Sequence, residues 1–165
     1  SSMPQLNLKG VTLHPLWDLQ QYSDHELPFH LRYTNFRLPK HVDGSEELFN
    51  KLSNNEPYIL VHRYTGEHPD GIPISIENFR SANGWPECKI IEINETITDN
   101  MMHYIKLIQN AEEIHVVPSS FHCLVDSMET KAKLFVHDVR EKTSMMLNSP
   151  YNNHKWCIVN YNTKW

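Results

Sequence analysis

Short apolar runs alternate with amphipathic stretches along most of the chain. Each run is four to seven residues long and is followed by a segment with polar turn residues or helical spacing. Near-continuous apolar runs of this kind are typical of strands that are buried on both faces of a parallel sheet. The expected strands are 57–63, 89–93, 114–117, 133–137 and, near the C-terminus, 156–161.

Hydroxyl residues mark the expected starts of three helices. Ser45 precedes two glutamates and an apolar face, Thr96 or Thr98 precedes a second amphipathic stretch, and Ser119 follows the third strand. The alternation of strands and helices predicts an α/β fold with a Rossmann-like, mainly parallel sheet of about four or five strands and helices on both faces. Because right-handed crossovers align parallel strands, their carboxyl ends are expected along one edge.

The chain divides in sequence near residue 44. Four prolines interrupt residues 1–44, and the apolar residues between them keep no sustained period. We therefore expect an N-terminal arm or linker over residues 1–44 and a Rossmann-like domain over residues 45–165.

Composition narrows the class of partner. The 165 residues include 15 Lys and Arg against 20 Asp and Glu, which argues against nucleic acid or an anionic membrane as the main partner. No apolar run approaches the ~20 residues of a membrane span, and the N-terminus lacks a signal-peptide core. The three cysteines are scattered, as is typical of reduced thiols, so we expect a cytoplasmic protein.

Three turns are expected at the carboxyl edge of the sheet: 62–71, 94–100 and 118–122. Open α/β sheets bind their ligands at this edge. The turn after the third strand, PSSFH, offers backbone N–H groups and two hydroxyls to an anion, and a phosphate is the expected candidate. The alternative for Ser119 is a simple N-cap without a ligand. Arg63 and Arg80 are the arginines best suited to phosphate contacts.

Five segments carry a resemblance to a known family: HELPFHLRYTNFRLP, EELFNKL, EPYILVHRYTG, IIEINETITDNMMHYIKLIQNAEEIHVVPSSF and KLFVHDVR. In this order they resemble the C-terminal, donor-binding half of bacterial and phage glycosyltransferases of the GT-B, heptosyltransferase-like type. The resemblance implies binding of a nucleotide-sugar donor and, once a second domain supplies the acceptor, hexosyl or heptosyl transfer. The implied donor contacts are His62, Arg63, Thr98, Asn100, Ser119 and Ser120, with His122 in the same turn.

Other chemistry has less support in the sequence. The 11 histidines include no HExxH or paired HxH spacing, so we expect no metal site and hydrogen-bonded core or surface histidines instead. No cofactor is expected besides the nucleotide sugar, and no catalytic residue is assigned. The alternative function is a non-catalytic interaction module, in which the aromatic arm, Trp156 and Trp165 form a homodimer interface or contact a further N-terminal domain.

Overall fold

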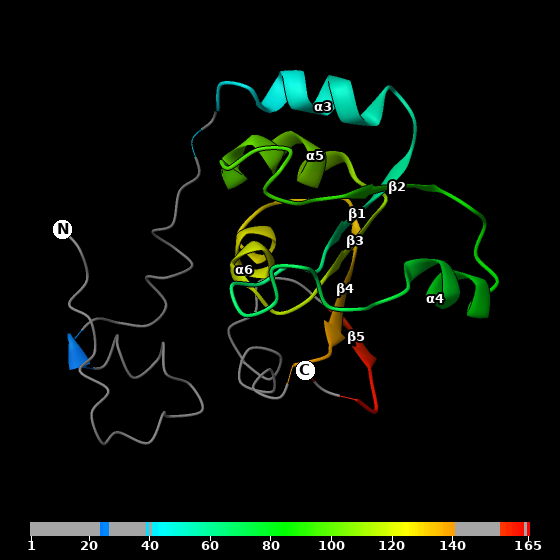
Figure 1. Ribbon diagram of the computed structural model, residues 1–165. Helices are drawn as coiled ribbons and strands as arrows, with labels where there is room; N and C mark the ends of the chain where they lie inside the picture. Colours follow the sequence, from blue (N-terminus) through cyan, green and yellow to red (C-terminus); the bar gives the residue numbers. More distant parts are fainter. Residues whose placement is uncertain (1–23, 27–38, 40, 141–155, 164) are drawn as a thin grey trace.

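The computed structural model describes residues 24–26, 39, 41–140, 156–163 and 165. Structural statements concern these residues alone. The expected arm, residues 1–44, falls almost entirely outside them, so its role stays a prediction. The expected domain, residues 45–165, contains every helix and strand that is labelled in Figure 1.

One parallel sheet lies at the centre of the described chain. Its strands follow the order β2-β1-β3-β4-β5, and each neighbouring pair is parallel. This architecture confirms the predicted α/β, Rossmann-like fold. The strands are β1 (Tyr58–His62), β2 (Lys89–Glu92), β3 (Glu113–Val116), β4 (Lys133–Asp138) and β5 (Cys157–Asn160).

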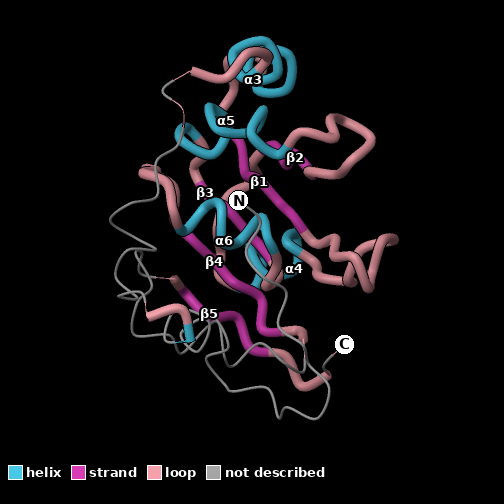
Figure 2. The backbone as a smooth tube through the Cα atoms, turned by 90° about the vertical axis from the view of Figure 1, so that its left-hand side faces the viewer, coloured by secondary structure: helices cyan, strands magenta, loops and turns pink. Residues whose placement is uncertain are grey.

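Helices cover both faces of the sheet, but unequally. One face carries α3 (Ser45–Ser53), the short 3-10 helix η1 (Met101–Tyr104), α5 (Ile105–Asn110) and α6 (Ser120–Asp126), whereas the other carries α4 (Ile76–Ala82). Figure 2 shows α5 and α6 in front of the strands, which run in their sheet order from β2 to β5.

Alternate residues of each strand supply two separate cores, because successive side chains point to opposite faces. On β1, Tyr58 and Leu60 join the core under α5 and α6, whereas Ile59 and Val61 join the smaller core under α4. The larger core includes Ile114 and Val136 at the centre of the sheet and the apolar faces of α5 and α6.

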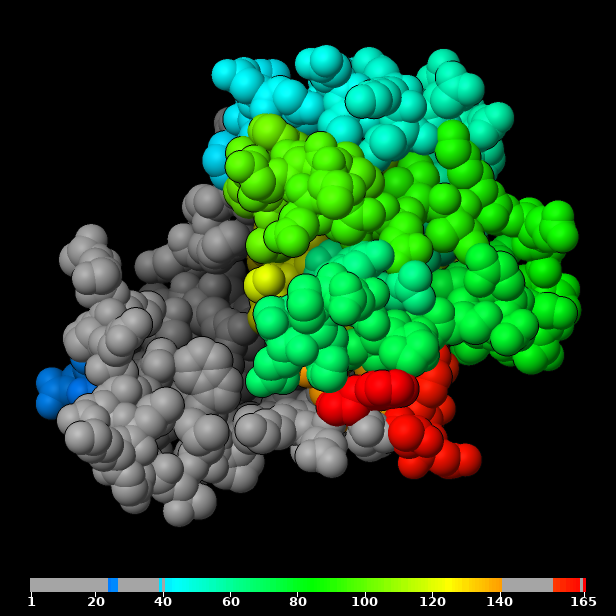
Figure 3. Space-filling model, in the orientation of Figure 1, coloured from blue at the N-terminus to red at the C-terminus, as the bar shows by residue number. Residues whose placement is uncertain are grey.

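The first helix begins differently from the prediction. Gly44 is its N-cap, with a φ of 85°, and no side chain caps it. The Ser45 hydroxyl instead accepts a hydrogen bond from the Lys106 N–H at 3.2 Å, which joins α3 to α5. Lys106 also pairs with Glu46. In Figure 3 the surface of α3 accordingly lies directly against that of α5.

The helix α4 was not predicted from the sequence. The Ser75 hydroxyl caps it by accepting the Asn78 N–H at 3.3 Å, and Ile76 is buried beneath it. Its other buried residue is Arg80, which is 8 % exposed. A charged residue on the inward side breaks the apolar period, so seven residues gave no helical signal.

The helix expected from Thr96 or Thr98 begins later, at Met101. Asn94 accepts the Thr96 N–H at 2.9 Å, which holds this segment in a turn, and Asn100 caps η1 by accepting the Met102 N–H at 3.0 Å. Side-chain hydrogen bonds to the backbone therefore compete with the helix over its expected first turn. No helix in the described residues is long and apolar enough to cross a membrane.

Candidate functional site

The sheet order places a topological switch point between β1 and β3. From β1 the chain crosses to β2 on the α4 side, and from β2 it crosses back past β1 to β3 on the opposite side. The two crossovers diverge at the carboxyl ends of β1 and β3, which leaves a crevice there in open α/β sheets. Val117 N–H donates to the His62 carbonyl at 3.1 Å, so the two strand ends lie side by side.

His62 ends β1 at this point. Its ring stacks on Phe121 of α6, with ring centroids 4.7 Å apart and an interplanar angle of 22°. Its Nδ1 is buried and has no hydrogen-bond partner in the described part of the chain. Burial lowers the pKa of His62 to about 4, so the ring is neutral at pH 7.

The turn after β3 presents Ser119 and Ser120 differently. Ser119 is the N-cap of α6, and its hydroxyl accepts the His122 N–H at 3.4 Å. Ser120 is exposed at the first position of the helix. Ser119 is therefore the predicted N-cap, which leaves its proposed role toward an anion untested, while Ser120 keeps a hydroxyl at the surface of the edge.

His122 points into the protein, away from the edge. It is 4 % exposed, and its ring meets Trp156 edge-on at a centroid distance of 4.5 Å. Burial lowers its pKa to about 4, an effect partly offset by the nearby Asp126. This histidine is a core residue of α6, and the structure does not bring it to the surface of the turn.

Arg140 supplies a cation at the edge that the sequence reasoning missed. It follows β4 by two residues, and its Nη1 donates to the Pro118 carbonyl at 2.8 Å. Its Nη2 donates to Glu67 at 2.7 Å. One guanidinium thus joins the loop after β1 to the turn after β3. Its position directly after a predicted strand, on the edge shared by all parallel strands, is the signal that could have identified it.

Arg63 lies at the same edge but faces β2. Its Nε donates to Glu92 at 2.5 Å, and the Tyr64 hydroxyl donates to the same oxygen at 3.0 Å. The loop that follows returns to Arg63, whose carbonyl accepts the Ile72 N–H at 2.8 Å. Gly71 makes this return with a φ of 89°, and a Cβ there would lie 3.2 Å from the Tyr64 ring.

The side chains of Thr98 and Asn100 are hydrogen-bonded within a local cluster around η1. The Thr98 hydroxyl lies 2.7 Å from His103 Nδ1, and the Asn100 side-chain nitrogen lies 3.2 Å from His103 Nε2. A Cβ on Gly44 would lie 3.3 Å from the same ring, so this cluster also fits under the start of α3. Within the described residues, the side-chain hydrogen bonds of Thr98 and Asn100 stay in this cluster and do not reach His62 or Ser119.

Arg80 lies at the opposite end of the sheet. Its Nη1 pairs with Glu113, the first residue of β3, and its Nη2 donates to the Pro86 carbonyl at 2.5 Å. The expected phosphate contact of Arg80 is therefore separated from the carboxyl edge by the length of β3. Its structural role is to neutralise the buried carboxylate of Glu113, because a buried charge without a partner costs much free energy.

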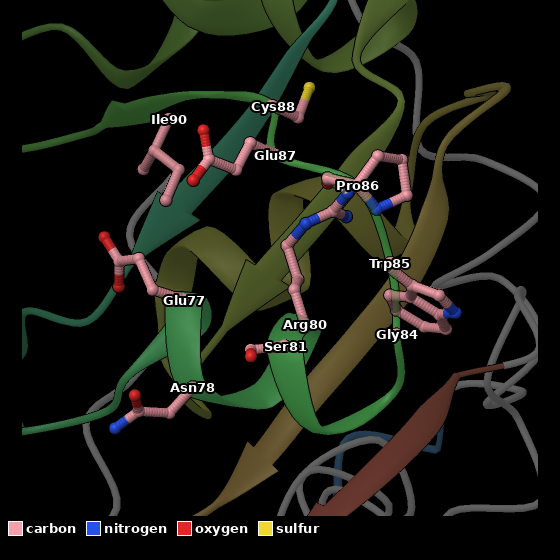
Figure 4. A pocket seen from close by; sticks show the side chains of 10 residues that line it. All are labelled: Glu77, Asn78, Arg80, Ser81, Gly84, Trp85, Pro86, Glu87, Cys88 and Ile90. Atoms are coloured by element: carbon pink, nitrogen blue, oxygen red, sulfur yellow. Dashed lines mark hydrogen bonds between the residues drawn. The ribbon is translucent and has the colours of Figure 1, made fainter.

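A hollow of about 850 Å³ adjoins Arg80 on the α4 side, away from the switch point. Figure 4 shows Arg80 reaching along its base toward Pro86, with Trp85 at one wall and Glu77 and Glu87 at the rim. Because Arg80 is paired with Glu113, the charge of the lining comes from Glu77 and Glu87, and a negative lining does not suit a phosphate. No group of three or more His, Cys, Asp or Glu side chains in the described residues is arranged to hold a metal ion.

Fold and site together define a Rossmann-like α/β protein with polar side chains at the strand edge of its switch point. Comparison of the chain with protein-family models, with curated proteins and with solved structures finds no match. The function is therefore argued from the side chains at this edge.

Proposed function

We propose that this chain binds a nucleoside diphosphate sugar at the switch point between β1 and β3, as the donor-binding half of a glycosyltransferase. The observation that carries the proposal is the convergence of three groups at one strand edge. These are the ring of His62, the exposed turn at Ser120 and the guanidinium of Arg140, which is bonded to Pro118 of that turn.

Arg140 is suited to a phosphate because its present anionic partner is easily exchanged. Glu67 is 72 % exposed at its side chain, and ion pairs of this kind contribute little to stability. A phosphate oxygen would replace the glutamate at Nη2, since both are oxyanions that a guanidinium binds through charge-assisted hydrogen bonds. The bond from Nη1 to Pro118 would keep the guanidinium in place during this exchange.

His62 would contribute a neutral, flat surface to the same crevice. With its pKa near 4 it carries no charge at pH 7, so it adds a hydrogen-bonding ring and no second cation. Stacked on Phe121, it is held in one orientation. Such a platform suits a sugar or a nucleobase beside the phosphates.

In the transfer itself, an acceptor oxygen would attack the anomeric carbon as the bond to the nucleoside diphosphate breaks, with inversion. The negative charge on the departing diphosphate would be stabilised by Arg140 and the turn at Ser119. A second domain, in the same or another chain, would have to hold the acceptor, because orientation of both substrates provides much of the acceleration.

Thermal denaturation with UDP, GDP, ADP and CMP and their sugars tests the binding step. We expect one nucleotide to raise the melting temperature by several degrees in a concentration-dependent manner. Arg140→Met should abolish the rise, and Arg63→Met should leave most of it. Lys131→Met is the matched control, because Lys131 pairs with an exposed carboxylate, Glu112, at the amino end of β4. No rise with any nucleotide, or a rise that survives Arg140→Met, would contradict the proposal.

A second candidate function is an interaction module, favoured by the exposed apolar side chains near the C-terminus. Ile158 on the edge strand β5 is 43 % exposed and Trp165 is 49 % exposed. Edge strands with exposed apolar residues are frequent sites of pairing with another chain. Light scattering over a range of concentrations distinguishes the two functions, because a dimer that no nucleotide stabilises would favour the module.

A further inference from the structure

The edge strand β5 is held at each end by contact with a buried histidine. Before the strand, Trp156 meets the ring of His122 and its Nε1 donates to Asp126 at 2.9 Å. After the strand, the Tyr161 hydroxyl lies 2.7 Å from Nδ1 of His137, which is fully buried. The two contacts lie on opposite faces of the sheet, under α6 and on the α4 side.

Between these contacts β5 has little burial of its own. Its four residues are exposed or half-buried, and its ladder partner in the described residues is β4. A strand this short gains little from its own side chains, so the contacts at its two ends carry much of its attachment.

Hydrogen bonds fix the protonation state of the histidine at the second end. The ionised Glu113 is an acceptor only, so His115 donates to it from Nε2 at 3.0 Å. His115 Nδ1 then accepts from His137 Nε2 at 2.9 Å, and His137 Nδ1 accepts from the Tyr161 hydroxyl at 2.7 Å. Each ring is neutral, and each nitrogen has one role. We call these residues, together with Arg80, the histidine chain.

In the described residues, no carboxylate is in contact with the His137 ring to balance a proton added there. Such a proton would turn His137 Nδ1 into a donor facing the Tyr161 hydroxyl, while Arg80 already neutralises Glu113 at the far end. Burial, reinforced by His115, lowers the pKa of His137 to about 3. His122 is in a similar position, since its Nδ1 has no partner in the described residues.

We propose that β5 is an acid-released edge strand, detached from β4 when His122 and His137 take up protons while the remaining four strands stay paired. Once Trp156 and Tyr161 withdraw, water reaches both rings, and each charge is hydrated. The release exposes the hydrogen-bonding edge of β4, which is otherwise covered along Phe135–Asp138.

The charged groups that the structure describes near the two rings do not reverse this direction, since the pKa of each histidine stays lowered. The titratable and charged groups that face the two rings from the described elements are His115, Glu113 and Arg80 along the chain, Tyr161 after β5, and Asp126 on α6. Among the described residues, Asp126 is the anion beside His122, where it partly offsets the effect of burial, and it accepts a hydrogen bond from Trp156. Asp138 lies next to His137 in sequence but on the opposite face of β4.

The direction and the size of the pH effect on the release of β5 follow from the pKa values. Attached, the two histidines have pKa values near 4 and 3, and released they return to the ordinary value near 6.5. The released state binds more protons, so release becomes more favourable as the pH falls below about 6.5. At pH 5.5 the opening equilibrium should rise roughly tenfold for each histidine relative to pH 7.5.

Amide hydrogen exchange on the full chain at pH 7.5 and pH 5.5, corrected for intrinsic rates, tests the release. The protection of β5 should fall by roughly 100-fold between the two conditions, the product of two tenfold steps. The other edge strand, β2, is a matched internal control. It also has four residues and one ladder partner, and none of its residues contacts His122 or His137 in the described structure, so its protection should change less than about threefold.

The double variant His122→Phe, His137→Gln keeps a ring against Trp156 and an amide between His115 and Tyr161, but neither residue titrates. Its β5 should hold the same protection at both pH values. His122→Phe alone should retain a roughly tenfold fall, which tests the proposal if the double variant does not fold. The proposal is overturned if wild-type β5 protection is independent of pH, if β2 loses as much, or if the non-titrating variants keep the full loss.

Discussion

On one face of the sheet, Ile114 and Val116 of β3 join an apolar core with α5 and α6, whereas on the other face Glu113 and His115 of the same strand belong to the histidine chain. Both faces are buried. The first face is stabilised by apolar burial, whose free energy is proportional to the buried area and does not depend on direction. The second depends on four directional hydrogen bonds among five side chains.

Because one face is apolar and the other is hydrogen-bonded, the two faces contribute differently to the fold. An apolar layer stabilises any arrangement that keeps it buried, while a polar chain is satisfied in one register only. His115 and His137 meet across the β3–β4 ladder, and Tyr161 extends the same chain past β5. We therefore infer that the α4 side specifies how β3, β4 and β5 align, which in turn sets the spacing between the Ser119 turn and Arg140.

The largest effect is expected from Arg80→Met. The variant leaves Glu113 buried with no cation, and breaking a buried ion pair by removing one partner costs about 3–5 kcal/mol of unfolding free energy. Urea denaturation at pH 7.5 measures this cost. His115 would then be free to take up a proton beside Glu113, so its pKa should rise and part of the loss should be recovered at pH 6.

The control for Arg80→Met is Arg80→Met with Glu113→Leu. Replacing both partners of a buried pair by apolar groups of similar size is often close to neutral. The double variant should therefore be more stable than Arg80→Met alone. A double variant that is less stable than the single one would show that the pair itself, and not the orphaned carboxylate, stabilises this face.

The apolar face should respond to Ile114→Ala by about 2–4 kcal/mol, through lost burial and a cavity beneath α6. Because no titratable group is removed, the cost measured by urea denaturation should be the same at pH 7.5 and pH 6. This constancy is the sharpest contrast with Arg80→Met. A cost that changes with pH would show that the two faces are coupled across the sheet.

Much of the sheet could be predicted because apolar runs identify buried strands whatever lies on either face. The run EIHVV gave β3 from Ile114, Val116 and Val117, and the serine cap after it was also correct. Both signals are local. The identity of each strand's neighbour, and hence the switch point, is a property of the whole chain and came from the structure.

The polar chain and Arg140 escaped prediction for the same reason. Glu113 and His115 belong to β3 and His137 to β4, and the distance between the two strands' side chains depends on the ladder register. Arg80 was expected to contact a phosphate, because the sequence does not show its partner Glu113, which lies 33 residues away. The candidate edge was found from strand ends, but the cation that anchors it follows β4, a strand that no turn motif marked.

The smallest effect is expected from Tyr161→Phe, at about 1 kcal/mol of unfolding free energy. The variant keeps the ring but removes the hydroxyl that donates to His137, which leaves a buried nitrogen without a partner. Urea denaturation of the wild type, Tyr161→Phe, His137→Phe and the double variant forms a cycle that measures the coupling energy between the two side chains. A coupling energy near 1 kcal/mol would show that the last hydrogen bond of the histidine chain, from Tyr161 to His137, also stabilises the α4 side. A coupling near zero would mean that the histidine chain ends at His137 and that β5 is attached by its ladder and by the contacts of Trp156.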